Sequence, residues 1–257
     1  MSYSPALSAN KPLVDFVVAG AQKGGTTALY DYLAEDPAIC MARIKETHFF
    51  DDDARDWSAP DYEAYHALFA EPSDRLCGEA TPIYIYWPCA LERIARYNRA
   101  MRLIVLLRDP VARAWSHWRM EHFRGVEPLN FSEAIRGGRG RLFAGGRGAP
   151  WGYDREFSYV ERGFYGDQVE RLFAIFPREQ TLILRSTALQ DEPAETLERV
   201  RDFLGAPARP PAGPRQVHVG ATEEGLDLDP GDAAFLRELY ARDDERLKAL
   251  TGFSFQS

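Results

Sequence analysis

Glycine, lysine and threonine residues at positions 20 to 27 have the spacing of a phosphate-binding turn. An apolar run, Phe16 to Ala19, precedes them and predicts a short strand, and a helix is expected to open at Thr26 or Thr27. Glycines from Gly20 to Gly25 let the backbone turn tightly and bring its N–H groups close to a ligand. The helix directs unsatisfied N–H groups and the positive end of its dipole into the same space, so an anion is expected there.

The position of Lys23 distinguishes this turn from the loop of nucleotide kinases. The kinase pattern, G-x-x-x-x-G-K-[ST], has lysine directly after the second glycine, followed by a hydroxyl that binds magnesium. Here Gly20 and Gly25 keep the glycine spacing, but Thr26 occupies the lysine position and the lysine lies inside the turn. The pattern therefore favours phosphate binding and disfavours magnesium-assisted transfer of a γ-phosphate. A plain glycine-rich turn between strand and helix is the alternative.

A loop containing Glu46 and His48 offers candidates for general-base catalysis. It follows a predicted short strand at residues 37–41, where α/β proteins place loops that contact ligands. Glu46 can take a proton from an attacking hydroxyl or amine, and His48 can act as a second base or orient the carboxylate. A solvated Glu46 paired with Lys45 is the alternative.

Arg108 directly follows the most clearly predicted strand of the chain, the apolar run from Met101 to Leu107. A guanidinium at this point can hold a phosphate through two parallel hydrogen bonds. Ser116 lies eight residues later, in a helix expected to begin at Pro110. Because loops at the carboxyl ends of parallel strands meet in one crevice, Arg108 is expected near the glycine turn. An ion pair between Arg108 and Asp109 is the alternative.

Predicted strands alternate with predicted helices along the chain, which is typical of a three-layer α/β/α fold with a mainly parallel central sheet. Further strands are expected at residues 75–79 and 181–184, and further helices at residues 61–69, 88–97, 158–176, 193–204 and 229–250. The glycine- and arginine-rich residues 137–148 are expected to form a surface loop, with a substrate lid as the alternative. We expect one domain over residues 1–257, with residues 1–12 as a loose lead-in.

The composition is that of a soluble globular protein, with 45% hydrophobic and 27% charged residues. A net charge of −8 argues against general binding to nucleic acid or to a membrane surface. No signal peptide and no run long enough to span a membrane is evident, so stable membrane insertion is not expected. Three cysteines show no metal-binding spacing, and no metal site is expected. A reducing cytoplasm is the simplest location.

Five segments together resemble the sulfotransferases that use 3′-phosphoadenosine 5′-phosphosulfate (PAPS), in the branch that contains heparan-sulfate sulfotransferases and their bacterial relatives. The segments are AQKGGTTAL, KETHFF, GEATPIY, LLRDPVARAWSHW and RGFYGDQVERLF. The resemblance implies that the turn binds the 5′-phosphosulfate through Lys23, Gly24, Gly25, Thr26 and Thr27. It also implies that Arg108 and Ser116 bind the 3′-phosphate and that Glu46 is the catalytic base. Lys23 would assist departure of the nucleotide, and His48 is the competing candidate for the base.

Two more residues complete the nucleotide-binding candidates that the resemblance suggests. Tyr165 lies in the RGFYGDQVERLF segment, and Arg215 lies in RQVHVG, the nearest match to a later nucleotide-binding loop of the family. Ala80 stands where heparan 3-O-sulfotransferases carry a lysine that contacts sugar. With the net charge of −8, this favours a small metabolite, a lipid or a neutral glycan as acceptor. The alternatives to a sulfotransferase are a small-molecule or nucleotide kinase and a non-catalytic nucleotide-binding module.

Overall fold

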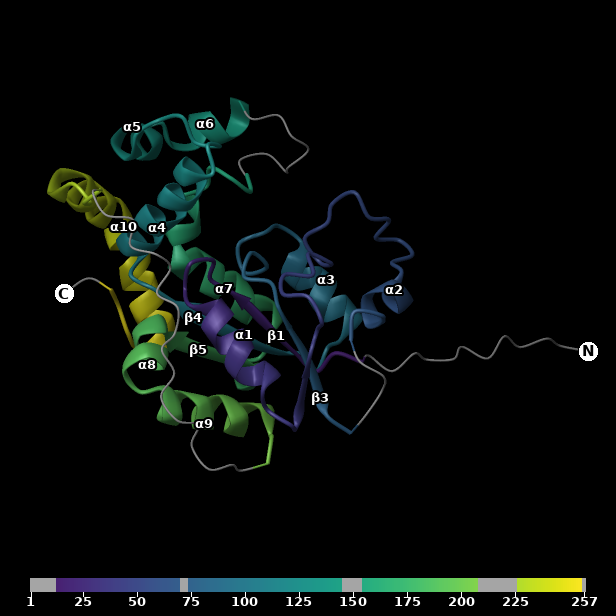
Figure 1. Cartoon of the computed structure of the whole chain (residues 1–257). Helices are drawn as coiled ribbons and strands as arrows, with labels where there is room; N and C mark the ends of the chain where they lie inside the picture. Colours follow the sequence, from purple (N-terminus) through teal and green to yellow (C-terminus); the bar gives the residue numbers. More distant parts are fainter. Residues whose placement is uncertain (1–12, 70–73, 145–153, 208–225, 256–257) are drawn as a thin grey trace, which may run out of the picture.

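A five-stranded parallel sheet lies at the centre of the computed structural model, which describes residues 13–69, 74–144, 154–207 and 226–255 (Figure 1). The strand order is β2–β3–β1–β4–β5, and every pairing is parallel. The strands are β1 (Phe16–Gly20), β2 (Ile39–Met41), β3 (Leu76–Ala80), β4 (Arg102–Leu107) and β5 (Thr181–Arg185). Since all five run the same way, the loops that follow them emerge at one edge of the sheet.

Ten α-helices connect and cover the strands within the described part of the chain. They are α1 (Thr26–Ala34), α2 (Tyr62–His66), α3 (Ala90–Tyr97), α4 (Pro110–Phe123), α5 (Phe131–Arg136), α6 (Gly138–Ala144), α7 (Tyr165–Ile175), α8 (Ser186–Asp191), α9 (Pro193–Leu204) and α10 (Pro230–Thr251). Single 3₁₀ turns at Glu161–Gly163 and Arg178–Gln180 precede α7 and β5.

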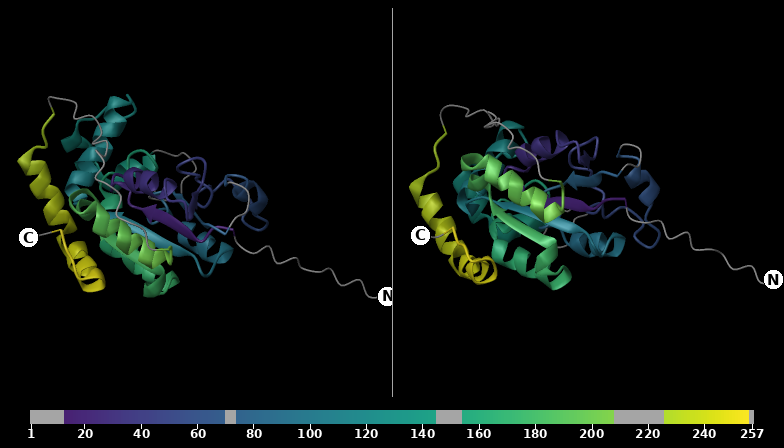
Figure 2. Two further views of the ribbon diagram at one scale, coloured as in Figure 1. Left: turned by 60° about the horizontal axis from the view of Figure 1, so that its bottom comes forward. Right: turned by 90° about the horizontal axis from the view of Figure 1, so that it is seen from below.

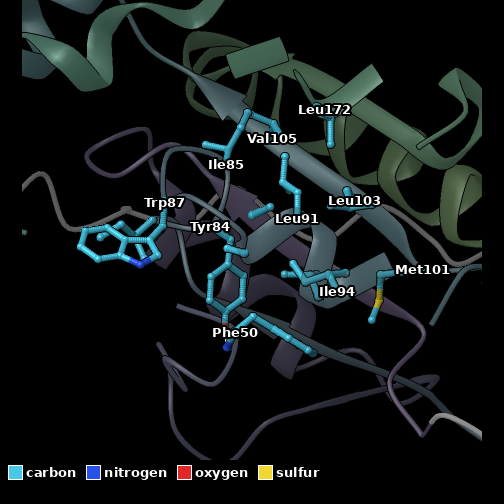
Figure 3. Close-up of a cluster of buried hydrophobic side chains, with 14 of the residues drawn as sticks. Phe50, Tyr84, Ile85, Trp87, Leu91, Ile94, Met101, Leu103, Val105 and Leu172 are labelled. Atoms are coloured by element: carbon cyan, nitrogen blue, oxygen red, sulfur yellow. Dashed lines mark hydrogen bonds between the residues drawn. The ribbon is translucent and has the colours of Figure 1, made fainter. Parts of the chain in front are cut away.

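Side chains alternate along the strands, so each face of the sheet buries its own apolar cluster. On one face, Val18 and Ile104 pack with residues of α1, α8 and α9. On the other face, Val17 and Leu103 pack with residues of α3 and α7, and Figure 3 shows part of this cluster. The sheet is therefore the middle layer between two layers of helices, which confirms the predicted three-layer α/β/α class (Figure 2).

A third apolar cluster lies outside the sheet and joins α4, α5 and α10. Trp118, Phe131, Tyr159 and Tyr240 are among its buried members. Helix α10, yellow in Figures 1 and 2, packs against both α7 and α4. This cluster fixes α4 and the segment before α7, which both contribute side chains to the candidate site.

Two predictions of secondary structure are wrong. Residues 138–144, expected in a loop, form helix α6. In this helix Leu142 is buried, and Arg141 forms an ion pair with Glu127 (Nη1 to Oε2, 2.8 Å). The helix expected from residue 158 begins only at Tyr165, because the chain first makes a 3₁₀ turn. At Gly163 in that turn, a Cβ would come within 2.4 Å of the Tyr240 hydroxyl oxygen.

Candidate active site

The glycine turn follows β1 and is fastened to the neighbouring strand β4. The Ala21 N–H donates to the Leu106 carbonyl (2.8 Å), and the Gly24 N–H donates back to Ala21 (2.9 Å). Gly25 precedes α1 with φ of 91°, and no side chain caps the helix. The first N–H groups of α1 are therefore available to an anion. Apart from the adjoining backbone, no heavy atom of the described residues lies within 4 Å of where a Cβ of Gly25 would be, so a ligand can approach the turn there.

Positive charge gathers around this turn. Burial lowers the pKa of Lys23, and the charges of Arg108 and Arg124 lower it further, while Glu121 acts in the opposite direction. Burial and the charges of Arg162 and Arg113 likewise hold the pKa of His117 well below its usual range. Burial is the largest cause of both shifts, and the further lowering by arginine charges reflects a positive local potential. An anionic ligand would relieve that repulsion.

Arg108 extends this positive region at the end of β4. Its half-buried side chain forms no hydrogen bond or ion pair with any residue that the structure describes. The alternative partner, Asp109, instead accepts a hydrogen bond from the Ala112 N–H (2.8 Å) and caps α4. Ser116, two turns into α4, is partly exposed. The guanidinium of Arg108 is therefore available to a ligand, as a phosphate site requires.

The loop after β2 carries Glu46 and His48. Glu46 forms ion pairs with Lys45 and with His48 (Nε2 to Oε2, 3.6 Å). His48 Nδ1 also lies 2.9 Å from Oδ2 of Asp51, whose side chain is buried and is bound in turn by Arg155. The side chains of Glu46 and His48 remain 37% and 47% exposed. Both side chains therefore reach solvent.

Opposite shifts in pKa assign charges to this pair. Burial alone would raise the pKa of Glu46, but hydrogen bonds from His48 and Lys45 outweigh it and lower the pKa to about 2. Hydrogen bonds to Asp51 and Glu46 raise the pKa of His48 to about 9, against the effect of burial. At neutral pH Glu46 is a carboxylate and His48 an imidazolium. Only Glu46 can accept a proton in this state.

Unusual backbone conformations coincide with the candidate catalytic residues. Lys23, Glu46 and His48 have φ of 66°, 63° and 52°, and among the described non-glycine residues only Cys89 shares a positive φ. Such conformations cost free energy and persist where tertiary contacts impose them, and they cluster at functional sites. The backbone thus marks Lys23, Glu46 and His48 independently of their side chains.

Glu79, which the sequence analysis did not assign a role, anchors the loop of Glu46. It is fully buried in β3, and burial raises its pKa. Its carboxylate accepts hydrogen bonds from four hydroxyls, those of Thr47 (2.8 Å), Thr81 (2.6 Å), Tyr65 (2.9 Å) and Tyr84 (3.0 Å). The Glu46 N–H donates to the Ala80 carbonyl at 2.9 Å, beside Glu79. A glutamate inside an otherwise apolar strand was the available signal in the sequence.

The structure separates the other predicted nucleotide-binding residues. Thr26 is buried and Thr27 is exposed at the start of α1, beside the turn. Tyr165 is only 1% exposed and packs in the apolar cluster under the sheet, so its contact with a nucleotide stays a prediction. Arg215 lies outside the described residues. Asp51 and Arg155 were missed because their contacts join segments far apart in the sequence.

The parallel α/β fold, the glycine turn and the cationic strand ends are together typical of proteins that bind phosphate-containing ligands. The family model described as "Sulfotransferase domain" matches residues 13–218. The chain therefore belongs to the sulfotransferase family, as the sequence motifs predicted.

Similar proteins come from both curated sequences and solved structures. The chain is 31% identical over 207 residues to heparan sulfate glucosamine 3-O-sulfotransferase 3B1 of Homo sapiens, covering 77% of this chain and 47% of that protein. The corresponding figures for 3-O-sulfotransferase 5 of Mus musculus are 28% over 199 residues, 75% and 54%. The crystal structure of a sulfotransferase from Alicyclobacillus acidocaldarius superimposes with a TM-score of 0.78 and 25% identity, over 93% of this chain and 96% of that one.

The chain spans about half the length of the curated relatives that it matches. Within the described ranges, no helix is both long and apolar enough to cross a membrane. The cytoplasmic location and the single-domain organisation stay predictions.

Proposed function

We propose that this chain transfers a sulfonate group from PAPS to a hydroxyl, in preference to an amine, of an acceptor. One observation carries the proposal: Lys23 and Arg108 stand at the uncapped glycine turn, and no described carboxylate forms an ion pair with either. Uncompensated cations beside free N–H groups suit a ligand with several phosphate-type anions. Family membership favours a sulfonate donor over the kinase alternative.

The proposed mechanism uses Glu46 and Lys23. The bound donor supplies an activated sulfonate, whose bond to the phosphate oxygen breaks as the acceptor oxygen bonds to sulfur. Glu46 accepts the proton that the acceptor hydroxyl loses. The Lys23 ammonium, held at the turn, stabilises the negative charge that develops on the departing phosphate oxygen. His48, as an imidazolium, orients the Glu46 carboxylate.

The low pKa of Glu46 makes it a weak base while its ion pairs are intact. We therefore propose that the acceptor displaces Lys45 from Glu46 when it binds. Loss of that pair raises the pKa of Glu46 toward its ordinary value and strengthens it as a base.

We propose a small metabolite, a lipid or a neutral glycan as the acceptor. Ala80, at the position where the resemblance places a sugar-contacting lysine, is fully buried, so its methyl group does not reach a ligand. The net charge of −8 disfavours a polyanion approaching the molecule. Several relatives are named for heparan sulfate, so heparan-type chains are the decisive comparison.

Calorimetric titration with 3′-phosphoadenosine 5′-phosphate, the product nucleotide, tests the donor. We expect binding without magnesium, and we expect Arg108→Ala to weaken it by about 1.5–3 kcal/mol, the scale of a hydrogen bond to a charged group. Binding of adenosine 5′-phosphosulfate, which lacks the 3′-phosphate, should hardly change in this variant. Magnesium-dependent binding of ATP, with no response to the bisphosphate, would contradict the proposal. Donor binding without turnover of any acceptor would indicate a non-catalytic module.

A further inference from the structure

Arg162, in the 3₁₀ turn before α7, is a buried guanidinium whose partners are neutral. It is 3% exposed, and none of the carboxylates in the described part of the chain forms an ion pair with it. Its Nε donates to the Ser158 hydroxyl (2.8 Å), and its Nη2 donates to the carbonyls of Arg155 (2.8 Å) and Asp154 (3.3 Å). Its remaining donor group, Nη1, binds the side-chain oxygen of Gln22. A buried charge without a counter-ion is costly, so this arrangement calls for a role.

The contact with Gln22 reaches the phosphate-binding turn. Gln22 directly precedes Lys23, whose backbone has a positive φ of 66°. Arg162 comes from a segment 140 residues further along the chain, so this hydrogen bond holds the turn from outside. By binding Gln22, Arg162 restrains the turn in which Lys23 has its positive φ.

The contact with the Arg155 carbonyl reaches the loop of Glu46. The Arg155 side chain binds the carboxylate and the carbonyl oxygen of Asp51 and stacks over the Trp87 ring at 4.2 Å. Asp51 in turn holds His48, which pairs with Glu46. A chain of contacts thus runs from the glycine turn through Arg162 and Arg155 to Asp51 and His48 by hydrogen bonds, and from His48 to Glu46 by an ion pair of 3.6 Å.

We propose that Arg162 is a positioning residue that holds the donor-binding turn and the Glu46 loop in one fixed relation. This inference rests on the proposed sulfonate transfer, because it assigns the donor to one loop and the base to the other. The planar guanidinium meets all four partners at once, through donors that point in three directions. Lysine has a single ammonium on a flexible stem and cannot reproduce this set. Because Arg162 is buried, it acts on the reactants through these partners.

Arg162→Lys tests the proposal, because it keeps the charge and removes the fork of donors. We expect the Kd of 3′-phosphoadenosine 5′-phosphate to rise about tenfold or more, which corresponds to about 1.4 kcal/mol. We expect kcat to fall as well, since the base loop is released at the same time. The matched control is Arg102→Lys. Arg102 also binds a carbonyl, that of Leu204 at 2.6 Å, but it begins β4 and so lies at the end of the strand opposite Arg108. Its replacement should leave Kd and kcat unchanged.

A double-mutant cycle with Gln22→Ala separates positioning from general loss of stability. If Arg162 acts on the donor through Gln22, the double variant should have the same Kd for the bisphosphate as whichever single variant binds it less tightly. Additive losses would overturn the proposed route. Free guanidinium ion should partly restore donor binding to Arg162→Gly, a rescue that a merely unfolded variant would not show.

The outcomes for the donor and for Arg162 are distinguishable. Failure of the wild-type protein to bind the bisphosphate would refute the proposed function. Wild-type binding that Arg162→Lys retains in full would refute the positioning role alone. Melting temperatures of all variants show whether each is folded under assay conditions. Gln22→Ala changes the less buried partner of the contact and tests the same link should Arg162→Lys fail to fold.

Discussion

Glu46 is the residue on which the proposed chemistry depends most directly. Glu46→Gln keeps the shape of the side chain and removes its ability to accept a proton. A general base typically contributes about 10²–10⁴-fold in rate, so we expect kcat to fall about 10²-fold or more. Affinity for the donor should stay within a few-fold of wild type, because the turn around Lys23 binds it. Steady-state kinetics and calorimetry measure the two quantities separately.

His48→Ala is the matched variant for the competing assignment of the base. Because His48 is an imidazolium at neutral pH, its loss should lower kcat through poorer orientation of Glu46 and not abolish turnover. If the Glu46→Gln variant keeps its activity and the His48→Ala variant loses it, His48 is the base.

The pKa of His48 also predicts how stability depends on pH. The folded-state pKa of about 9 lies above the ordinary value of 6.5, so the folded state binds the proton more tightly. The contribution of His48 to stability is therefore fully present below about pH 6.5 and is lost as the pH rises through 9. Urea denaturation of wild type and His48→Ala should show a difference in unfolding free energy that shrinks over this range. A difference independent of pH would mean that Asp51 and Glu46 do not hold the proton on His48.

Among the structural elements, the glycine turn allows a paired test of close packing against backbone strain. A Cβ at Gly24 would come 2.4 Å from the Leu106 carbonyl oxygen and 2.8 Å from that of Ala21. Both are backbone atoms, so neither can move away without distorting the turn or β4. At Gly25 the space is open and only the positive φ opposes alanine. We expect Gly24→Ala to lower the free energy of unfolding by about 1–3 kcal/mol and to weaken donor binding about tenfold or more. Gly25→Ala should lower the free energy of unfolding by about 1–2 kcal/mol, because alanine is strained at a positive φ.

Thermal melts and calorimetry of the two variants provide the comparison. Equal losses of donor affinity in Gly24→Ala and Gly25→Ala would show that packing of the turn against β4 does not control the binding site.

Local sequence patterns predicted those elements that are bounded by their own end residues or are buried along nearly their whole length. Strand β4 is apolar from Leu103 to Leu107, after its first residue, Arg102. Helix α9 begins at Pro193 and is followed by Gly205, and its predicted bounds, Pro193–Leu204, match the structure. Helix α6 is rich in glycine and depends on its contact with Glu127, which no local pattern reveals. The late start of α7 follows a 3₁₀ turn in which Gly163 lies close to Tyr240, a residue far along the chain.

The same distinction applies to the candidate site. Lys23, Arg108 and Glu46 were predicted because each follows a recognisable strand within a short motif. Asp51 and Arg162 were not, since their roles arise from hydrogen bonds between segments separated by about a hundred residues or more. Motif spacing identifies residues that could contact a ligand, whereas the residues that hold them are set by tertiary packing.

For the whole molecule, the net charge of −8 predicts which acceptors are used. A polyanionic chain is repelled at long range, and screening by salt reduces this repulsion. We expect labelled donor to transfer preferentially to small metabolites, lipids or neutral glycans in acceptor pools at low ionic strength. Preferential labelling of heparan-type chains would contradict this expectation. The same assay with Glu46→Gln gives the background without base catalysis.

The strand order has a consequence for how the chain acquires its structure. Strand β1 is made first, yet it lies between β3 and β4, which are made later. At about 5–20 residues per second, its apolar side chains wait several seconds during synthesis for their partners. The Ala21 N–H also needs the carbonyl of Leu106 before the turn is complete. The glycine turn therefore matures only after the centre of the sheet has assembled, and until then FVVAG is an exposed segment suited to chaperone binding.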